Sequence, residues 1–130
     1  MDKLEEGLYN ELKNDTVLAN KVKSGTIYNI YPLVVPEDTQ FSKAITYQEI
    51  TQNLSYPTAR TSLFQINCIA DTYDDALDLS RDINRIFDDK HEFKLGGLQA
   101  VKWTQFYGRT ALKDWDAKKF IYVVEIAIKY

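Results

Sequence analysis

The sequence predicts one α+β domain over residues 1–130, with a mostly antiparallel sheet of about four to five strands and helices packed on one face. The first observation is the expected order of elements, ααβββαββ, in which strands follow one another in runs and helices are grouped. The second is a change of period after residue 70, where an alternating pattern gives way to a helical one. The third is size, because 130 residues with 45% apolar content suit a single core.

The central strand and helix are expected within residues 61–90. Residues 62–70 alternate, and one set of side chains is expected on a buried face: Phe64, Ile66, Cys68 and Ala70. Beyond them the apolar side chains follow helical spacing: Ala76, Leu79, Ile83, Ile86 and Phe87. Either Asp71 or Thr72 can cap this helix. Two ion pairs are expected on its outer face, Asp78 with Arg81 and Asp82 with Arg85.

Two helices are predicted before the first strand. The first covers Asp2–Lys13, where apolar side chains recur at steps of four: Leu4, Leu8 and Leu12. The second is short and is capped by Asn14 or Asp15; its apolar residues are Val17, Leu18 and Val22. Gly25 is predicted to end it in a left-handed conformation. Thr26–Tyr31 is then predicted as a short strand that ends at Pro32.

The remaining chain is predicted as strands joined by exposed connections. Residues 32–42 contain two prolines and no clear period, which predicts a long exposed connection. Strands are expected over 43–53, 98–107 and 120–130, and the last is expected to leave a sheet edge free. A turn or wider loop is expected over 54–61, a flexible connection over 88–97, and a polar loop over 108–119.

The composition argues against several classes of function. A net charge of −3 and a pI near 5.1 disfavour a nucleic-acid binder that neutralises phosphates. A single cysteine excludes an intramolecular disulfide, and Cys68 reads as a small apolar residue in a reducing compartment. Residues 1–6 do not resemble a signal peptide, and no window has the roughly 20 apolar residues needed to cross a bilayer. We therefore expect a soluble protein made in a cytoplasm, without a membrane partner.

No residue set predicts a catalytic, cofactor or metal site with any specificity. His91 lies among charged neighbours and is interpreted as a solvated loop residue rather than as a base. Asp114 and Asp116 can ligate Mg²⁺ or Ca²⁺, but no further oxygen ligands follow at loop spacing. A small metal-dependent hydrolase using these two carboxylates and His91 remains an alternative. The main expectation is a protein that is not an enzyme and has no cofactor.

Aromatic and basic side chains gather in the later part of the chain: Trp103, Phe106, Tyr107 and Trp115 with Lys102, Arg109 and Lys113. Such a cluster can stack single-stranded nucleic acid. The acidic balance of the rest of the chain favours packing or a protein interface instead. The connections at 32–42 and 108–119 are longer than a minimal domain needs, and long ordered loops usually serve contacts.

A set of segments spread over nearly the whole chain carries a family resemblance: Leu8-Tyr9 and Leu12, Gly25-Thr26-Ile27-Tyr28, Tyr31-Pro32, Val35-Pro36, residues 44–50 (AITYQEI), residues 64–73 (FQINCIADTY) leading into Asp75-Ala76, and a closing strand rich in Val, Ile and Tyr. In order and spacing these segments resemble the bacteriophage tail-completion or tail-terminator proteins, which join head to tail. Residues 52–60 depart from the pattern, because this stretch is often longer in the family.

The resemblance implies a structural role in the tail or neck of a virion, assembled in the bacterial cytoplasm from a long-tailed phage or a prophage. Family members form a ring, typically a hexamer, on the head-proximal end of the tail tube. The ring stops tube polymerisation and presents a docking surface for the head connector. The implied partners are the chain itself, the major tail tube protein and a head-completion protein. DNA passes through the lumen without specific binding. A head-completion protein on the portal side is the alternative within the same machinery.

Candidate protein-interface residues lie in the two long connections. In the first they are Glu37, Asp38 and Phe41, and in the second Arg109, Lys113, Trp115 and Asp116. A solvated loop residue is the simpler interpretation for each of them. For Trp115 a contact is favoured, because tryptophan is enriched at interface hot spots.

Overall fold

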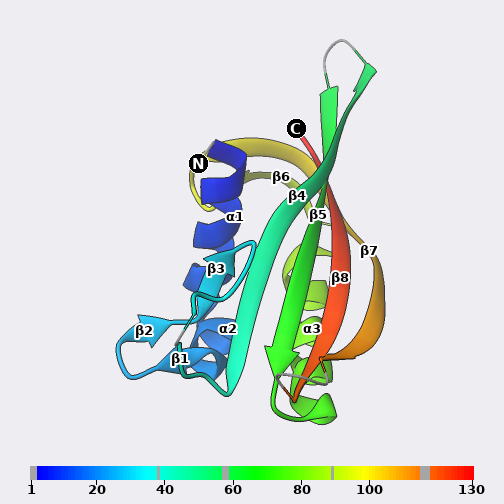
Figure 1. Cartoon of the computed structure of the whole chain (residues 1–130). Coiled ribbons are helices and arrows are strands. Elements are labelled where there is room, and N and C mark those ends of the chain that lie inside the picture. The colour runs from blue at the N-terminus through cyan, green and yellow to red at the C-terminus, as the bar shows by residue number, and fades with distance from the viewer. Residues whose placement is uncertain (1–2, 38, 57–58, 89, 115–117) are drawn as a thin grey trace.

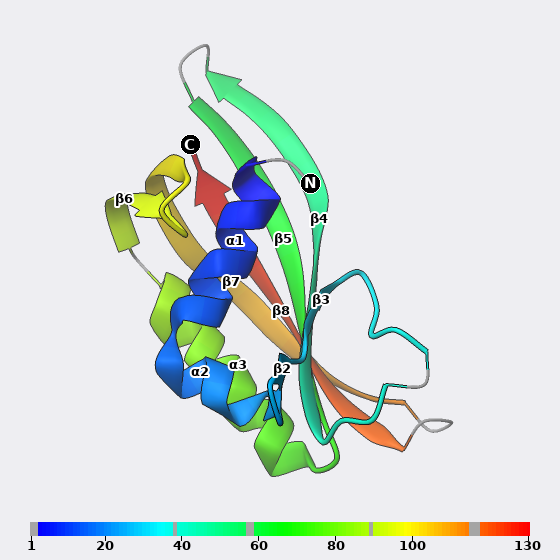
Figure 2. The ribbon, with the colours of Figure 1, turned by 90° about the vertical axis from the view of Figure 1, so that its left-hand side faces the viewer.

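Three helices pack on one face of a six-stranded sheet in the computed structural model, which describes residues 3–37, 39–56, 59–88, 90–114 and 118–130 (Figures 1 and 2). The elements follow the chain in this order: α1 (Lys3–Asn14), α2 (Thr16–Lys21), β1 (Lys23–Ser24), β2 (Ile27–Tyr28), β3 (Ile30–Pro32), β4 (Lys43–Tyr56), β5 (Ala59–Ala70), α3 (Tyr73–Phe87), β6 (Lys90–Leu95), β7 (Gln99–Asp114) and β8 (Lys119–Lys129).

The sheet order is β3-β4-β5-β8-β7-β6, and β1 and β2 form a separate two-stranded hairpin. Only the β3–β4 pair is parallel within the described sheet; the other neighbours are antiparallel. The predicted α+β class, the mostly antiparallel sheet and the one-sided helices are therefore confirmed. The predicted number of strands and the order ααβββαββ are wrong, because the described chain has more strands than expected.

The last strand does not leave an edge free, contrary to the prediction. β8 lies in the interior of the sheet, paired with β5 on one side and with β7 on the other. The two ends of the sheet order are β3 and β6 instead.

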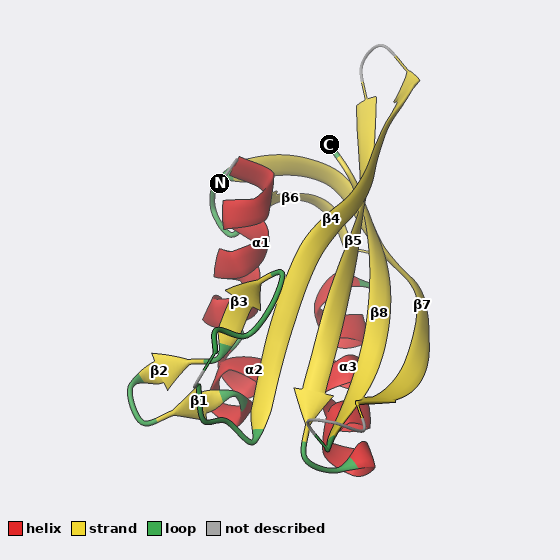
Figure 3. Cartoon of the chain, in the orientation of Figure 1, coloured by secondary structure: helices red, strands yellow, loops and turns green. Residues whose placement is uncertain are grey.

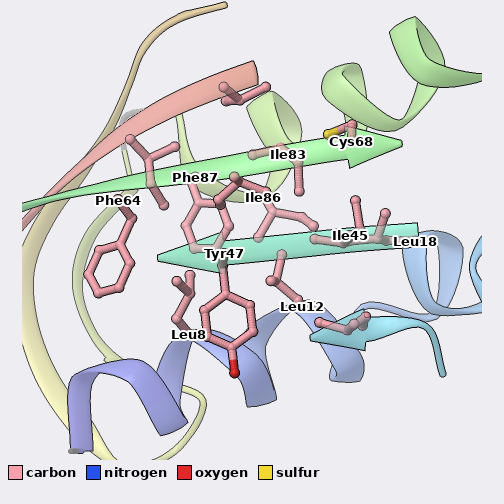
Figure 4. Packing of buried hydrophobic residues seen from close by; sticks show 14 of the residues in the cluster. Leu8, Leu12, Leu18, Ile45, Tyr47, Phe64, Cys68, Ile83, Ile86 and Phe87 are labelled. Atoms are coloured by element: carbon pink, nitrogen blue, oxygen red, sulfur yellow. The ribbon is translucent and has the colours of Figure 1, made fainter. Parts of the chain in front are cut away.

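The core lies between the helices and the sheet, and the alternation of β5 predicts it correctly. The four side chains predicted to face the core are 0% exposed: Phe64, Ile66, Cys68 and Ala70. The apolar stripe of α3 and the leucines of α1 meet them from the other layer (Figure 4). Each fully buried Leu, Ile or Phe side chain contributes about 1.5–3 kcal/mol of transfer free energy.

The first two helices occur as predicted, with one difference at the end of α2. The Asp15 side chain caps α2 by accepting a hydrogen bond of 3.0 Å from the Leu18 amide. The helix ends at Val22, and Gly25 does adopt a left-handed conformation (φ 63°). Gly25 lies in the turn between β1 and β2 and not at the end of α2, because a short hairpin follows the helix.

The strand predicted over Thr26–Tyr31 is divided into β2 and β3 by a buried asparagine. The amide nitrogen of Asn29 donates hydrogen bonds to the Val22 carbonyl (3.0 Å) and to Ser24 Oγ (2.9 Å). These bonds hold the β1–β2 hairpin against the end of α2. The chain therefore changes direction at Asn29 before β3 joins the main sheet (Figure 1).

The third helix begins as predicted, with Thr72 Oγ1 accepting a hydrogen bond of 3.2 Å from the Asp75 amide. The expectation that Asp82 lies on the outer face is wrong. Asp82 is 7% exposed and pairs with Lys21 of α2 at 2.8 Å, because α2 packs over this side of α3. It also pairs with Arg85 at 3.5 Å, as predicted, while Asp78 pairs with Lys21 at 2.8 Å.

Three segments predicted as connections are largely strand. The 88–97 segment contains β6, the 108–119 segment contains the end of β7, and the 54–61 segment contains the ends of β4 and β5 (Figure 3). Each is held by cross-strand pairing with a neighbour: Lys90–Leu95 with β7, Arg109–Asp114 with β8, and Leu54 with Arg60. The β4–β5 hairpin projects beyond the rest of the sheet (Figures 1 and 2).

Candidate interface surface

The face of the sheet opposite the helices, here called the outer face, is not covered by any described helix (Figure 2). Its side chains alternate with those of the core, so Ile69 and Ile121 lie on it. Ile69 pairs with Ile121 across β5 and β8, and Ile121 pairs with Leu112 across β8 and β7. Three apolar side chains therefore form one row across this face.

The loop between β3 and β4 folds over one end of the outer face. It leaves the sheet at Leu33, whose amide donates a hydrogen bond of 2.9 Å to the Tyr47 carbonyl. Leu33 has a φ of 66°, a left-handed conformation that turns the chain away from the edge of β4. Figure 2 shows the loop on the side of the sheet away from the helices. An open pocket of about 370 Å³, the outer pocket, lies between this loop and the sheet; its lining is Leu33, Val34, Val35, Phe41, Thr46, Asn67, Ile69, Lys119 and Ile121.

Lys119, at the start of β8, joins the two connections that the sequence singled out. Its ammonium group donates a hydrogen bond of 3.0 Å to the Phe41 carbonyl and lies 4.6 Å from the centre of the Phe41 ring. The same group forms an ion pair with Asp71. The β3–β4 loop and the base of the β7–β8 hairpin are thus one continuous surface at one end of the sheet.

This surface exposes large apolar side chains. Val34 is 70% exposed, Leu33 62% and Leu112 54%, while Val35, Phe41, Ile69 and Ile121 are partly exposed around them. Single exposed apolar residues are ordinary, but a contiguous group of them marks a contact site. The outer pocket and its rim are therefore the candidate interface of the molecule.

The predicted interface residues are placed as follows. Phe41 lines the outer pocket, and Glu37 is exposed in the same loop. Arg109 and Lys113 lie within β7, not in a loop, where they pair with Val124 and Phe120. The other three predicted positions lie outside the described residues: Asp38, Trp115 and Asp116.

Sequence reasoning missed the apolar members of this surface. Leu33, Val34 and Leu112 were not predicted as contact residues. A usable signal existed in the run of three apolar residues, 33–35, between two prolines of an exposed connection. Apolar side chains that a connection exposes without a core to enter are candidates for a contact.

Two residues of the alternative hydrolase site, His91 and Asp114, do not come together, and the third, Asp116, lies outside the described residues. His91 pairs with Trp103 near one end of β7, whereas Asp114 pairs with Lys119 at the other end. Trp103 and Asp114 are eleven positions apart along an extended strand, which is roughly 35 Å. Among the described residues no group of three potential metal ligands occurs.

The aromatic and basic residues predicted as a cluster in the later part of the chain are distributed along β7, apart from Trp115, which lies outside the described residues. Trp103 stacks near His91, with 6.5 Å between ring centres, and Phe106 packs against the core. Phe106 therefore serves packing, whereas Trp103 has a ring contact with His91. Burial raises the pKa of the Cys68 thiol and disfavours its reactive thiolate form.

An ionic network joins α2 and α3 on the helical side of the molecule. The Arg85 guanidinium donates two hydrogen bonds to the Asp15 carboxylate, of 2.8 and 2.9 Å. These bonds hold the pKa of Asp15 below its ordinary value of 3.8. Burial lowers the pKa of Lys21, but its hydrogen bonds with Asp78 and Asp82 outweigh this effect and raise it overall. Each charged side chain of this network is paired with a charge from the other helix. The network therefore stabilises the packing of α2 against α3.

Comparisons with known proteins identify a shared fold. No protein-family model matches the sequence, and no curated protein matches it. Among solved structures the chain is similar to one described as "Virion of native gene transfer agent (GTA) particle", with a TM-score of 0.70 and 15% sequence identity. The match covers 97% of this chain and 92% of that chain. No described helix is long and apolar enough to cross a membrane. The chain therefore has the same fold, over nearly its full length, as a component of that particle.

Proposed function

We propose that this chain is a structural protein of a phage or phage-like particle, and that it acts as the tail terminator. In this role it forms a ring, with a hexamer as the expected form, on the head-proximal end of the tail tube. The ring stops tube polymerisation and receives the head connector. The observation that carries the proposal is the fold shared with a gene transfer agent particle over 97% of the chain. The order of sequence segments resembling tail-completion proteins supports the same role.

The outer face supplies the kind of surface that this role needs. A ring requires two different patches on each subunit that fit one another, and the tube and the connector each require a further contact. The exposed apolar side chains around the outer pocket are suited to one of these contacts. The partners proposed are the chain itself, the major tail tube protein and a head-completion protein. DNA passes through the lumen without specific binding.

A head-completion protein on the portal side is the second candidate, because the similar structure is described by its particle and not by a position within it. Electron microscopy of particles assembled without this protein separates the two. Tails longer than normal support tube termination. Tails of normal length beside unjoined or empty heads support the portal side and contradict termination.

Self-association gives a second test of the terminator role. Size-exclusion chromatography with light scattering measures the mass of the protein alone and after addition of tube protein. We expect a ring, either at rest or on contact with the tube. A monomer that does not bind tube protein contradicts the proposal.

A further inference from the structure

A second recess lies at the β3 end of the sheet. Leu33 is the one residue that it shares with the lining of the outer pocket. It has a volume of about 450 Å³ and is lined by Glu5, Pro32, Leu33, Tyr47, Gln48, Glu49 and Ile50. We call it the edge recess. Two carboxylates, Glu5 from α1 and Glu49 from β4, stand on its wall beside the apolar side chains. Glu5 has a partner of its own, so the carboxylate that this wall offers to a cationic group is that of Glu49.

A buried hydroxyl group without a partner belongs to the same recess. Tyr47 is 2% exposed, and its hydroxyl oxygen makes no hydrogen bond among the described residues. Figure 4 shows the ring beside Leu8, with the hydroxyl oxygen pointing away from Ile86 and Phe87. A buried polar atom left unsatisfied costs about 1–3 kcal/mol, so its retention calls for an explanation. A donor carried by a binding partner is one source of the missing bond.

The backbone around the recess belongs to an open strand edge. β3 pairs with β4 only from Ile45 to Tyr47, and Leu33 then turns the chain away. Beyond Tyr47 the described strand that pairs with β4 is β5, on the other side. A register shift between Glu49 and Thr51 interrupts this edge, and such bulges protect an edge from long strand pairing. The edge recess is therefore suited to a side chain carried by a short segment.

The chain itself carries a matching group at the opposite end of the sheet order. β6 is the other edge strand, and its exposed residues include Lys94. The second lysine of this strand, Lys90, is already paired with Glu11 at 3.1 Å. Lys94 has no ion pair among the described residues. An ammonium group has three donors, enough to donate to both the Tyr47 hydroxyl and the Glu49 carboxylate.

We propose that the edge recess of one subunit receives Lys94 of a second copy of this chain. The contact joins two different surfaces, the β3–β4 end of one sheet and the β6 end of the next. Such a heterologous contact produces a ring when its rotation closes. This inference rests on the proposed function, because it names the contact by which the ring would form. A basic segment of another protein is the competing occupant, and the experiment below distinguishes it.

Charge reversal on each side tests the contact. We expect Glu49→Lys and Lys94→Glu each to weaken self-association by about tenfold or more, because each places like charges together. An equimolar mixture of the two variants restores association, since each new charge then meets its opposite. Sedimentation velocity over a concentration series provides the measurement, with tube protein added if the wild type forms the ring only in its presence. Glu6→Lys is the matched control, because it makes the same charge change at an exposed position of α1 outside the recess.

Tyr47→Phe separates a binding role from a structural one. Removal of an unsatisfied hydroxyl leaves the melting temperature of the monomer unchanged or higher. If the hydroxyl accepts a hydrogen bond from the second copy, the same change weakens association several-fold. A lower melting temperature with unchanged association overturns the inference.

The remaining outcomes also decide the question. Reversal variants that associate like the wild type, or a mixture as weak as either variant, exclude Lys94 as the occupant. Restoration by another virion protein, and not by the mixture, assigns the recess to that protein and overturns the proposal. None of these results bears on tail length in particles lacking the protein, so the inference can fail while the proposed function stands.

Discussion

Asp82 shows how the setting of a residue decides what its charge contributes. Lys21 contacts two carboxylates at the same distance of 2.8 Å, Asp78 and Asp82. The Asp78 side chain is 49% exposed, whereas that of Asp82 is 9% exposed. Water competes for the first contact and is excluded from the second. The two positions are therefore a natural pair for comparison.

We expect Asp82→Asn to lower the free energy of unfolding by about 1–2 kcal/mol, because it weakens a buried charge-assisted hydrogen bond. Asp78→Asn is the matched control and should cost no more than about 0.5 kcal/mol, as exposed pairs usually do. Urea unfolding followed by circular dichroism gives both values. Equal losses at the two positions would contradict the argument from burial.

The Asp15–Arg85 pair makes stability depend on pH in a defined direction. Hydrogen bonds from Arg85 lower the pKa of Asp15 below 3.8 in the folded protein. The unfolded chain therefore binds the proton more tightly than the folded one. The stabilisation is complete above the unfolded value and is lost as pH falls through the lowered native value.

Asp15→Asn tests this direction, because asparagine keeps the helix cap while removing the charge. We expect the variant to be less stable than the wild type near neutral pH by about 0.5–1 kcal/mol, since the Arg85 side chain is half exposed. The difference should close as pH falls below the native pKa of Asp15. Urea unfolding at a series of pH values measures it. A difference that stays constant with pH would show that Asp15 acts through packing alone.

At the scale of elements, two adjacent glycines show how α1 is attached to the sheet. Gly96 and Gly97 both have left-handed conformations, with φ of 57° and 77°. A Cβ atom on Gly96 would lie 2.6 Å from Asn10 Cβ and would also meet the Gly7 backbone. A Cβ atom on Gly97 meets nothing within 4 Å. The turn between β6 and β7 therefore contacts α1 directly at Gly96.

Alanine substitution at each glycine separates conformational strain from this close approach. Gly97→Ala should cost about 1–2 kcal/mol, the strain of a left-handed residue alone. Gly96→Ala should cost roughly 3 kcal/mol or more, because α1 must also move away from the sheet. Thermal and urea unfolding of both variants measure the difference. Similar costs would mean that α1 adapts freely at this contact.

The elements that the sequence predicted best are those with one buried face. The leucines of α1, the stripe of α3 and the alternation in β5 each report their contact with the core, because burial selects apolar residues at a regular period. The cap residues Asp15 and Thr72 were among the predicted candidates, because their side-chain oxygens accept a hydrogen bond from a free amide in the first turn of the helix.

The strands that the sequence did not predict lack such a period, because backbone pairing holds them in the sheet and does not require apolar side chains at alternate positions. In β6 one side chain, Leu95, is fully buried, and the strand holds its place through the backbone of β7. The end of β7 is held by pairing with β8, so this strand can carry polar residues. Its polar sequence was therefore interpreted as a loop. For the same reason the sequence drew attention to Phe41, which lines the outer pocket, but not to the exposed apolar residues Leu33 and Val34 of the same loop.

At the scale of the whole molecule, the chain presents two unlike surfaces on one rigid scaffold. The edge recess is acidic and lies at the β3 end of the sheet, whereas the outer pocket is mainly apolar and lies on the open face. Leu33 lines both, and its left-handed turn opens the strand edge and sends the loop across the outer face. A component that is bound by like copies and by unlike partners needs this kind of separation.

The apolar surface gives the prediction that tests the proposed role most directly. Val34 is 70% exposed, so Val34→Asp should change the free energy of unfolding by less than about 0.5 kcal/mol. The new charge sits on the rim of the outer pocket and should oppose burial against tube protein.

Val17→Asp is the matched control, because Val17 is 51% exposed on α2, which lies on the helical side. Co-sedimentation with polymerised tube protein measures binding. We expect Val34→Asp to reduce the bound fraction by about tenfold and Val17→Asp to leave it unchanged, since a buried charge without a partner costs several kcal/mol. Equal binding by both variants would move the tube contact away from the outer face.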